Sequence, residues 1–193
     1  MSDLKGRPIE DVAYLVCTAM KNAGVTAVLS GGGAAAVYAP HAYETRDLDF
    51  VLQSSISMPG ARPILDLGFL ETKSRGIYSH PDLPFTLEFL PGPLAVGGTV
   101  LTGWDTWEKD GHTLYIVSPL DCVRDRMAAA IHWRDPNSAK QAAAVAHERP
   151  IDIDGLRNWC LEEGGGPAFS IFEAYYRSSS FDTVRTQRDD FPI

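Results

Sequence analysis

The stretch from Val28 to Leu52 constrains the fold of this chain more than any other. Its sequence, VLSGGGAAAVYAPHAYETRDLDFVL, begins inside an apolar, β-branched run that starts at Val25 and ends at Ser30. Three glycines follow, and then the small residues 34–39, which favour a helix. A strand that passes through a glycine turn into a helix presents unpaired backbone N–H groups and the positive end of a helix dipole. We therefore expect an anion-binding site here, of a kind that would suit a phosphate.

Two carboxylates lie on the next predicted strand. Residues 47–52, DLDFVL, alternate polar and apolar with the two-residue period of a strand, so Asp47 and Asp49 share one face. Like charges placed this close repel each other unless a cation neutralises them, and Mg²⁺ prefers oxygen ligands. The phosphate cradle and the acidic pair together favour a nucleoside triphosphate bound through metal. Taken separately, the glycines could form only a turn, and the acids could be a solvated strand end.

This segment resembles the glycine motif and Asp-x-Asp pair of the DNA polymerase β-like nucleotidyltransferases, in particular their bacterial minimal and abortive-infection members. The resemblance is carried by Gly31, Gly32, Asp47 and Asp49, with a spacing between Gly32 and Asp47 that is slightly long for the family. It implies that Ser30, Gly31 and Gly32 contact the triphosphate. It also implies that Asp47 and Asp49 hold two Mg²⁺ or Mn²⁺ ions and act in catalysis.

Two further residues occupy positions that matter in the resembled family. Residues 85–90, FTLEFL, alternate as a strand and place Glu88 opposite the aromatic face. The family carries a third metal-binding and catalytic acid on such a strand, so Glu88 is the candidate, although it could be an exposed edge glutamate. Arg126 lies where the family often has a lysine and could contact the triphosphate. It could equally form an ion pair, for example with Asp121 or Asp125.

By this resemblance, the expected activity is transfer of a nucleoside monophosphate from a triphosphate to an acceptor hydroxyl. The acceptor could be an RNA end such as that of tRNA, a protein or a small molecule, and the enzyme could be a toxin with a cognate antitoxin. The alternative is a catalytically silent nucleotide-binding or partner-binding module of the same fold. A second alternative is a dinucleotide-binding fingerprint, because Gly31, Gly33 and Ala36 match its spacing, but no alternation of strands and helices follows as that fold requires.

The rest of the chain predicts an α/β (α+β) protein with a small mixed sheet flanked by helices and a helical C-terminal part. We expect a core at 1–117 and helices at 118–193 that pack on it as one compact domain. Ser118 and Pro119 mark a helix start. The helices are expected at 8–23, 34–39, 61–66, 118–133, 136–145, 153–163 and 168–177. Strands are expected at 25–30, 47–52, from 68, at 85–90 and at 113–117, with loops at 54–60, 78–84 and 91–103.

Composition limits the class of protein. The net charge of −8 argues against an extensive nucleic-acid footprint, which needs clustered basic residues. No apolar run is long enough to cross a membrane, and the N-terminus lacks a signal-peptide pattern, so a cytoplasmic protein is expected. Cys17, Cys122 and Cys160 are expected to be reduced and buried. Trp104 and Trp107 could stack on a base, but the interpretation we favour places them at the core.

Overall fold

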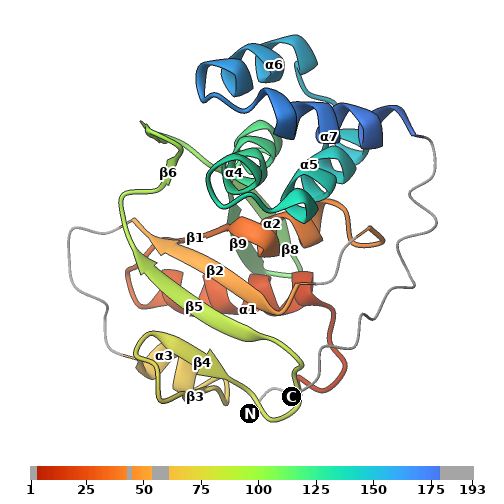
Figure 1. Ribbon diagram of the computed structural model, residues 1–193. Coiled ribbons are helices and arrows are strands. Elements are labelled where there is room, and N and C mark those ends of the chain that lie inside the picture. The colour runs from red at the N-terminus through yellow and green to blue at the C-terminus, as the bar shows by residue number, and fades with distance from the viewer. Residues whose placement is uncertain (1–3, 43–44, 54–60, 179–193) are drawn as a thin grey trace.

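The computed structural model describes residues 4–42, 45–53 and 61–178, and it contains a seven-stranded mixed sheet flanked by helices (Figure 1). The strand order is β3-β4-β5-β2-β1-β9-β8, and β6 and β7 form a separate ribbon. The strands are β1 Ala27–Ser30, β2 Asp47–Leu52, β3 Leu70–Glu71, β4 Ile77–Ser79, β5 Thr86–Pro91, β6 Ala95–Val96, β7 Thr99–Val100, β8 Asp105–Lys109 and β9 His112–Ile116. The helices are α1 Ile9–Asn22, α2 Gly31–Tyr38, α3 Arg62–Leu65, α4 Pro119–His132, α5 Pro136–Glu148, α6 Ile153–Glu162 and α7 Gly166–Arg177. The predicted fold class is confirmed.

The centre of the sheet is formed by β1, β2 and β5. All four residues of β1 are buried, and this strand pairs antiparallel with β2 and parallel with β9. Strand β2 in turn pairs parallel with β5 over its whole length. Helix α1 packs on β9 and β1, and its buried stripe includes Val12, Val16 and Met20, as the helical spacing predicts.

Helix α2 begins directly at the end of β1. We expected a glycine turn before a helix at 34–39, and this detail is wrong, because the three glycines themselves form the first helical turn. Gly31 adopts a positive φ of 63°, which allows the chain to change direction from strand to helix without an intervening loop. Every residue of α2 is buried, so the helix is part of the core rather than a surface element.

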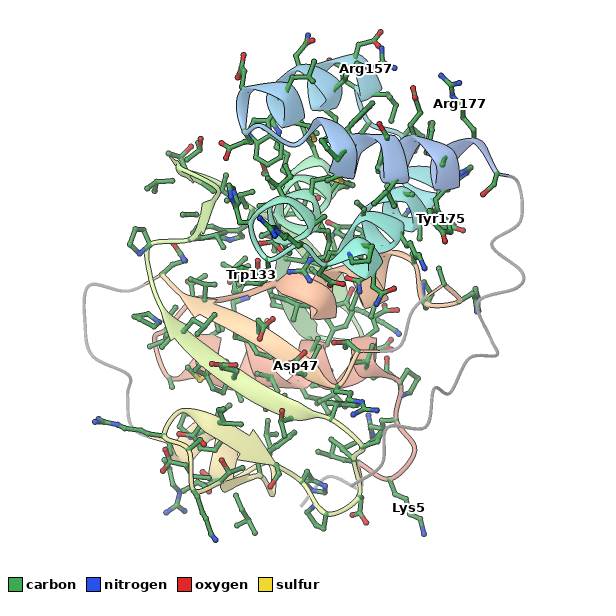
Figure 2. The ribbon with its side chains drawn as sticks, in the orientation of Figure 1. Lys5, Asp47, Trp133, Arg157, Tyr175 and Arg177 are labelled. Carbon is green, nitrogen blue, oxygen red and sulfur yellow. The ribbon has the colours of Figure 1, made fainter. Side chains whose placement is uncertain are left out.

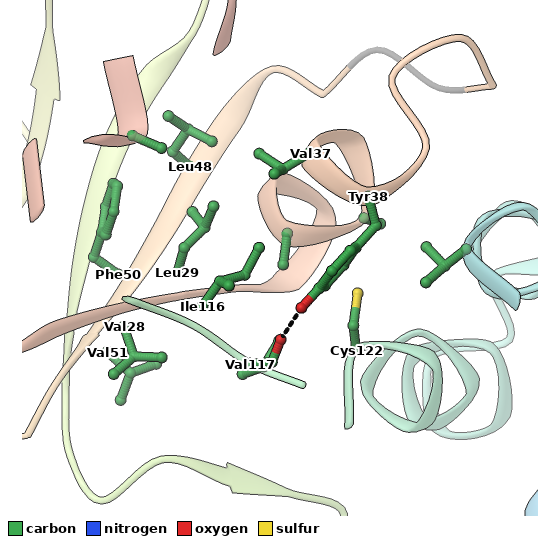
Figure 3. Close-up of a cluster of buried hydrophobic side chains, with 14 of the residues drawn as sticks. Val28, Leu29, Val37, Tyr38, Leu48, Phe50, Val51, Ile116, Val117 and Cys122 are labelled. Atoms are coloured by element: carbon green, nitrogen blue, oxygen red, sulfur yellow. Dashed lines mark hydrogen bonds between the residues drawn. The ribbon is translucent and has the colours of Figure 1, made fainter. Parts of the chain in front are cut away.

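The C-terminal helices share their core with the sheet. As predicted, the Ser118 hydroxyl caps α4 by accepting a hydrogen bond from the Asp121 amide at 3.2 Å. Helices α4 and α5 both pack against α2, and one continuous cluster of buried side chains extends from the strands to α7. Within it, the Tyr38 hydroxyl donates a 2.7 Å hydrogen bond to the Val117 carbonyl (Figure 3). This bond ties α2 to the end of β9.

Three other sequence expectations need correction. The expected loop at 78–84 begins only after Ser79, because the β-branched and aromatic residues before it form β4. The expected loop at 91–103 contains the β6–β7 ribbon, which turns at Gly97, where φ is 56°. Strand β8 was not expected at all. It is an edge strand with mostly exposed side chains, so its sequence lacks the apolar alternation of a half-buried strand.

Trp104 and Trp107 pack against the core, and the three cysteines are buried, as the sequence predicts. The Trp107 ring meets Tyr38 edge to face at 5.5 Å, and Trp104 meets Tyr115 at 6.5 Å. The three cysteines are buried free thiols, which confirms the prediction, and burial raises the pKa of each of them.

The predicted loop at 54–60 and the chain beyond residue 178 lie outside the described residues. Across the described ranges, no helix has the length and apolar content needed to span a membrane.

Replacing Gly33 by Ala should destabilise the fold, although alanine is normally the better helix former. A Cβ at Gly33 would lie 2.7 Å from a methyl group of Leu48 and 3.1 Å from one of Leu29, so these buried side chains or α2 itself would have to shift. We expect a loss of roughly 1–3 kcal/mol in the free energy of unfolding, measured by urea denaturation. Gly98→Ala is the matched control, because nothing lies within 4 Å of its Cβ position. Equal stability of the two variants would contradict this packing account.

Candidate functional site

A row of polar side chains crosses three neighbouring strands at one position of the sheet. In the strand register, Asp49 lies directly opposite Ser30 of β1 on one side and Glu88 of β5 on the other. Residues in register on paired strands point to the same face, so these three side chains share it. Asp47 lies two residues before Asp49 and therefore on that face as well. Figure 2 shows Asp47 on β2 near the middle of the molecule.

The opposite face of the same strands belongs to the hydrophobic core. Leu48 and Phe50 alternate with the two aspartates and are fully buried, as is Leu87 before Glu88, and Phe89 after it is 8% exposed. Phe50 and Phe89 stack with ring centroids 5.5 Å apart. Packing on this face fixes the register of β2 against β5, because a slip by one residue would expose the aromatic rings. The core thereby determines which carboxylates lie side by side.

The carboxylate of Asp49 lies against the backbone of Gly31, where α2 begins. A side chain on Gly31 would overlap this carboxylate, and the positive φ of Gly31 also favours glycine. The first N–H groups of a helix have no partner within it. Ser30 precedes the helix, is 6% exposed, and its hydroxyl makes no capping hydrogen bond. The strand end therefore brings together a buried hydroxyl, backbone N–H groups and a carboxylate.

The negative charges in this site act on one another. Burial, and then the charges of Asp47 and Glu88, raise the pKa of Asp49 to about 6, although Arg126 lowers it. In the described part of the chain, no hydrogen-bond donor reaches the carboxylates of Asp49 or Glu88. Asp47 is exposed and accepts a 3.1 Å hydrogen bond from the Thr45 hydroxyl. A half-buried carboxylate without donors is costly, and a cation would compensate it.

Arg126 comes from α4 and stands on the same side of the sheet. Its guanidinium donates two hydrogen bonds to one oxygen of Asp125, from Nε at 3.0 Å and from a terminal nitrogen at 2.6 Å. Burial lowers the pKa of Arg126. The negative charge of Asp125 and, with a smaller effect, that of Asp49 outweigh burial and raise this pKa above its usual range. The ion pair considered for Arg126 is therefore formed, with Asp125 as the partner, and the contact of Arg126 with a triphosphate stays a prediction.

The donor set suits Mg²⁺ bound together with a substrate. In the described residues, no group of three or more His, Cys, Asp or Glu side chains is arranged to hold a metal ion unaided. Mg²⁺ in phosphoryl-transfer sites is usually held by one or two carboxylates together with substrate phosphates and water. Asp47 and Asp49 on one face, with Glu88 beside them, fit that requirement in placement and in chemistry. Burial and the charges of Asp47 and Glu88 raise the pKa of Asp49, and a cation bound here would oppose that rise.

An open pocket of about 390 Å³ does not include the row of carboxylates. It is lined by residues 99–105 together with Ser118 and Asp121 at the start of α4. The preceding residue, Val117, donates a 3.0 Å hydrogen bond to the Leu29 carbonyl, which places this pocket beyond the end of β1. The carboxylates themselves lie on the sheet surface outside it.

The sequence alone named Asp125 only as one possible ion-pair partner of Arg126, together with Asp121. Asp125 holds the guanidinium of Arg126, and its negative charge also raises the pKa of Asp49. The signal was available, because an acid directly before an arginine in a helix can share its guanidinium. Sequence alone could not decide between Asp121 and Asp125. Asp121 instead receives a 2.6 Å hydrogen bond from Ser118 and lies 3.9 Å from Arg124.

Asn in place of Asp49 should stabilise the metal-free protein at pH 8. The folded protein holds the Asp49 proton more tightly than the unfolded chain does, because the pKa is raised from 3.8 to about 6. Ionisation above pH 6 therefore costs stability, by up to about 3 kcal/mol, and Asn avoids this cost. The advantage of the variant should shrink as the pH falls from 8 towards 4, as followed by urea unfolding.

Asp110→Asn serves as the control for this measurement. Asp110 is exposed at the turn between β8 and β9 and is not among the charges that act on Asp49, so this variant should differ little from the wild type at pH 8 or pH 5. A loss of stability in Asp49→Asn of the same size at pH 8 and pH 5 would contradict the electrostatic account.

The fold is similar to that of a nucleotidyltransferase-like protein. No model of a known protein family matches the sequence, and no curated protein sequence matches it. The structure superimposes on the crystal structure of an antigenic nucleotidyltransferase-like protein from Paracoccidioides brasiliensis with a TM-score of 0.54 and 12% sequence identity. The match covers 92% of this chain and 97% of that chain. The chain thus has a nucleotidyltransferase-like fold, in agreement with the fold that its glycine and Asp-x-Asp motifs predict.

Proposed function

We propose that this protein is a metal-dependent nucleotidyltransferase, which moves a nucleoside monophosphate from a triphosphate to an acceptor hydroxyl. The proposal rests chiefly on one observation, the row of Ser30, Asp49 and Glu88 at the start of α2. The fold shared with the nucleotidyltransferase-like protein of P. brasiliensis supports it. So does the resemblance of the sequence motifs to the polymerase β-like enzymes.

The start of α2 is the proposed binding place for the triphosphate. The first backbone N–H groups of the helix, from Gly31 and Gly32, would donate hydrogen bonds to phosphate oxygens, and the helix dipole favours their charge. The hydroxyl of Ser30 is buried beside them and could donate another. Arg126 stands on the same side and would neutralise further phosphate charge.

The acidic residues are the proposed metal ligands. Asp47 and Asp49 would hold Mg²⁺ or Mn²⁺, with Glu88 as a further ligand. When bound, the metal would lower the pKa of the acceptor hydroxyl and offset the charge on the leaving group.

The proposed reaction is an in-line displacement at the α-phosphorus. The acceptor oxygen forms a bond to this phosphorus while the bond to the bridging oxygen breaks, and pyrophosphate leaves. Glu88 is the proposed acceptor for the hydroxyl proton. Among the described residues, no donor competes for its carboxylate, so it is free to take up this proton. Asp49 lies against Gly31, so a metal held by Asp49 and a phosphate at the start of α2 would lie next to each other.

The identity of the acceptor stays a prediction. An RNA end such as that of tRNA, a protein side chain and a small molecule all offer a hydroxyl. The toxin role and the cognate antitoxin likewise stay predictions from the resemblance to abortive-infection enzymes.

A catalytically silent module of the same fold is the second candidate. One observation favours it, since the carboxylates in the described ranges do not by themselves form a three-ligand metal site. Such a module would bind triphosphate without transferring any part of it. The presence of both Asp47 and Asp49 favours the enzyme, because a silent site gains nothing from two repelling charges.

Transfer activity should depend strongly on the paired aspartates. The assay incubates purified protein with each α-labelled triphosphate, Mg²⁺, and total RNA or cell extract. Label should appear on an acceptor, and Asp47→Asn or Asp49→Asn should lower the rate on the order of a thousandfold, because the metals that act in the transition state are lost. Mg²⁺ with triphosphate should also raise the melting temperature of the wild type by mass action, and less so that of Asp49→Asn.

Asp110→Asn is the matched control for the loss of one carboxylate. Asp110 is exposed at the β8–β9 turn, and asparagine tolerates its φ of 52°. This variant should keep full activity. Tight triphosphate binding by the wild type without transfer to any acceptor would support the silent module instead.

A further inference from the structure

The face of the sheet that carries the carboxylates is open to solvent beyond β2. Along β5, Thr86 and Glu88 are partly exposed, whereas Leu87 and Phe89 on the opposite face are buried. Strand β4 shows the same alternation, because Tyr78 at its centre is buried and its two neighbours, which pair with β5, are partly exposed. In Figure 1, β5 lies in front of α1, and none of the described helices passes before this strand. The side of the site that faces β5 is therefore free for an acceptor.

Thr86 brings a hydroxyl group to this open side, next to the acidic residues. It lies opposite Asp47 in the register of β2 and β5, and it precedes Glu88 by two residues on the same strand. Its side chain therefore shares the face of both acids, and neighbouring strands are only about 4.8 Å apart. The Thr86 amide donates a 3.0 Å hydrogen bond to the Arg46 carbonyl, which fixes the backbone beside Asp47. The Thr86 hydroxyl, in contrast, makes no hydrogen bond within the described residues.

The other hydroxyl groups around the acids are less suitable acceptors. Ser30 lies on β1, on the far side of β2, where the phosphates are proposed to bind. The Thr45 hydroxyl is already engaged, since it contacts the carbonyl and the carboxylate of Asp47 at 3.0 and 3.1 Å. Ser79 lies opposite Thr86 on β4 and is one strand further from the aspartates. Among the described residues, Thr86 therefore carries the unengaged hydroxyl that lies closest to the aspartates in the strand order.

We propose that Thr86 is itself an acceptor, so that the protein transfers a nucleoside monophosphate to its own chain when no other acceptor is bound. This inference rests on the proposed function, which places the triphosphate at the start of α2 and assigns the acceptor proton to Glu88. The Thr86 hydroxyl oxygen forms a bond to the α-phosphorus while the bond to the bridging oxygen breaks. Pyrophosphate leaves, the hydroxyl proton passes to Glu88, and a phosphodiester then joins Thr86 to the nucleoside.

This self-transfer would be limited by its own product. Each chain can accept a single nucleotide at Thr86, because the reaction consumes the hydroxyl. The attached nucleotide would then occupy the open face beside Glu88, where an external acceptor has to approach. Modification of Thr86 would therefore also switch off transfer to other acceptors.

The test incubates the full-length protein with Mg²⁺ and α-labelled ATP without any added acceptor. Label should become attached to the protein, and tandem mass spectrometry of its peptides should locate the nucleotide on Thr86. Because triphosphate site and acceptor belong to the same molecule, the fraction of chains labelled per unit time should not depend on protein concentration. Thr86→Val keeps the β-branched shape without the hydroxyl, so labelling should be lost while the melting temperature stays close to that of the wild type. Thr86→Ser should restore labelling at this position.

Ser79→Ala is the matched control, because it removes the partly exposed hydroxyl that lies opposite Thr86 on the next strand, and it should be labelled as the wild type is. Labelling that persists in Thr86→Val, or a labelled fraction that rises with protein concentration, would overturn the inference. So would a wild type that transfers label to added RNA or cell extract but never to itself, and the proposed function would then stand. If the wild type labels neither itself nor any added acceptor, the proposed function fails, and this inference fails with it.

Discussion

The contact between the carboxylate of Asp49 and the backbone of Gly31 is the constraint on which the rest of the site depends. It joins the second residue of the Asp-x-Asp pair to the first residue of a helix, at a position where any side chain would overlap the carboxylate. The contact exists because β1 and β2 are paired so that Ser30 lies opposite Asp49. A negative charge held against the positive end of a helix is favourable. Burial, and after it the neighbouring acids, make the same place unfavourable for that charge, and the pKa of Asp49 rises accordingly.

The opposing face of the sheet supplies the rigidity that this contact needs. Leu48, Phe50, Leu87 and Phe89 are buried there, and they fix β2 and β5 in register. Helix α2 lies so close to the strands that Gly33 has no room for a methyl group, and the Tyr38 hydroxyl holds the other end of this helix to Val117. Helix α4 then brings Arg126, already paired with Asp125, to the same side as the carboxylates. Packing energy and site geometry therefore depend on the same elements.

Sequence patterns predicted those parts of the fold in which local chemistry and burial agree. The alternation of 47–52 and 85–90 predicted both strands and the face of each acid, and the Ser118-Pro119 pair predicted the start of α4. Prediction failed where burial did not impose a pattern. Strand β8 lies at the sheet edge with mostly exposed side chains, and β6 and β7 have only two residues each, which is too short for an alternating pattern. The pairing of Arg126 with Asp125 depends on side-chain rotamers, which spacing cannot determine, and the start of α2 at Gly31 depends on tertiary packing.

The central claim is that metal and triphosphate meet at the junction of β1, α2 and β2. Crystals of the wild-type protein grown with Mn²⁺ and a triphosphate analogue that cannot be transferred would test it most directly, through anomalous scattering from the metal. The account predicts an anomalous peak at coordinating distance, about 2.0–2.2 Å, from carboxylate oxygens of Asp47 and Asp49, with the triphosphate against the first N–H groups of α2. A triphosphate bound elsewhere, or a metal that touches neither aspartate, would contradict it.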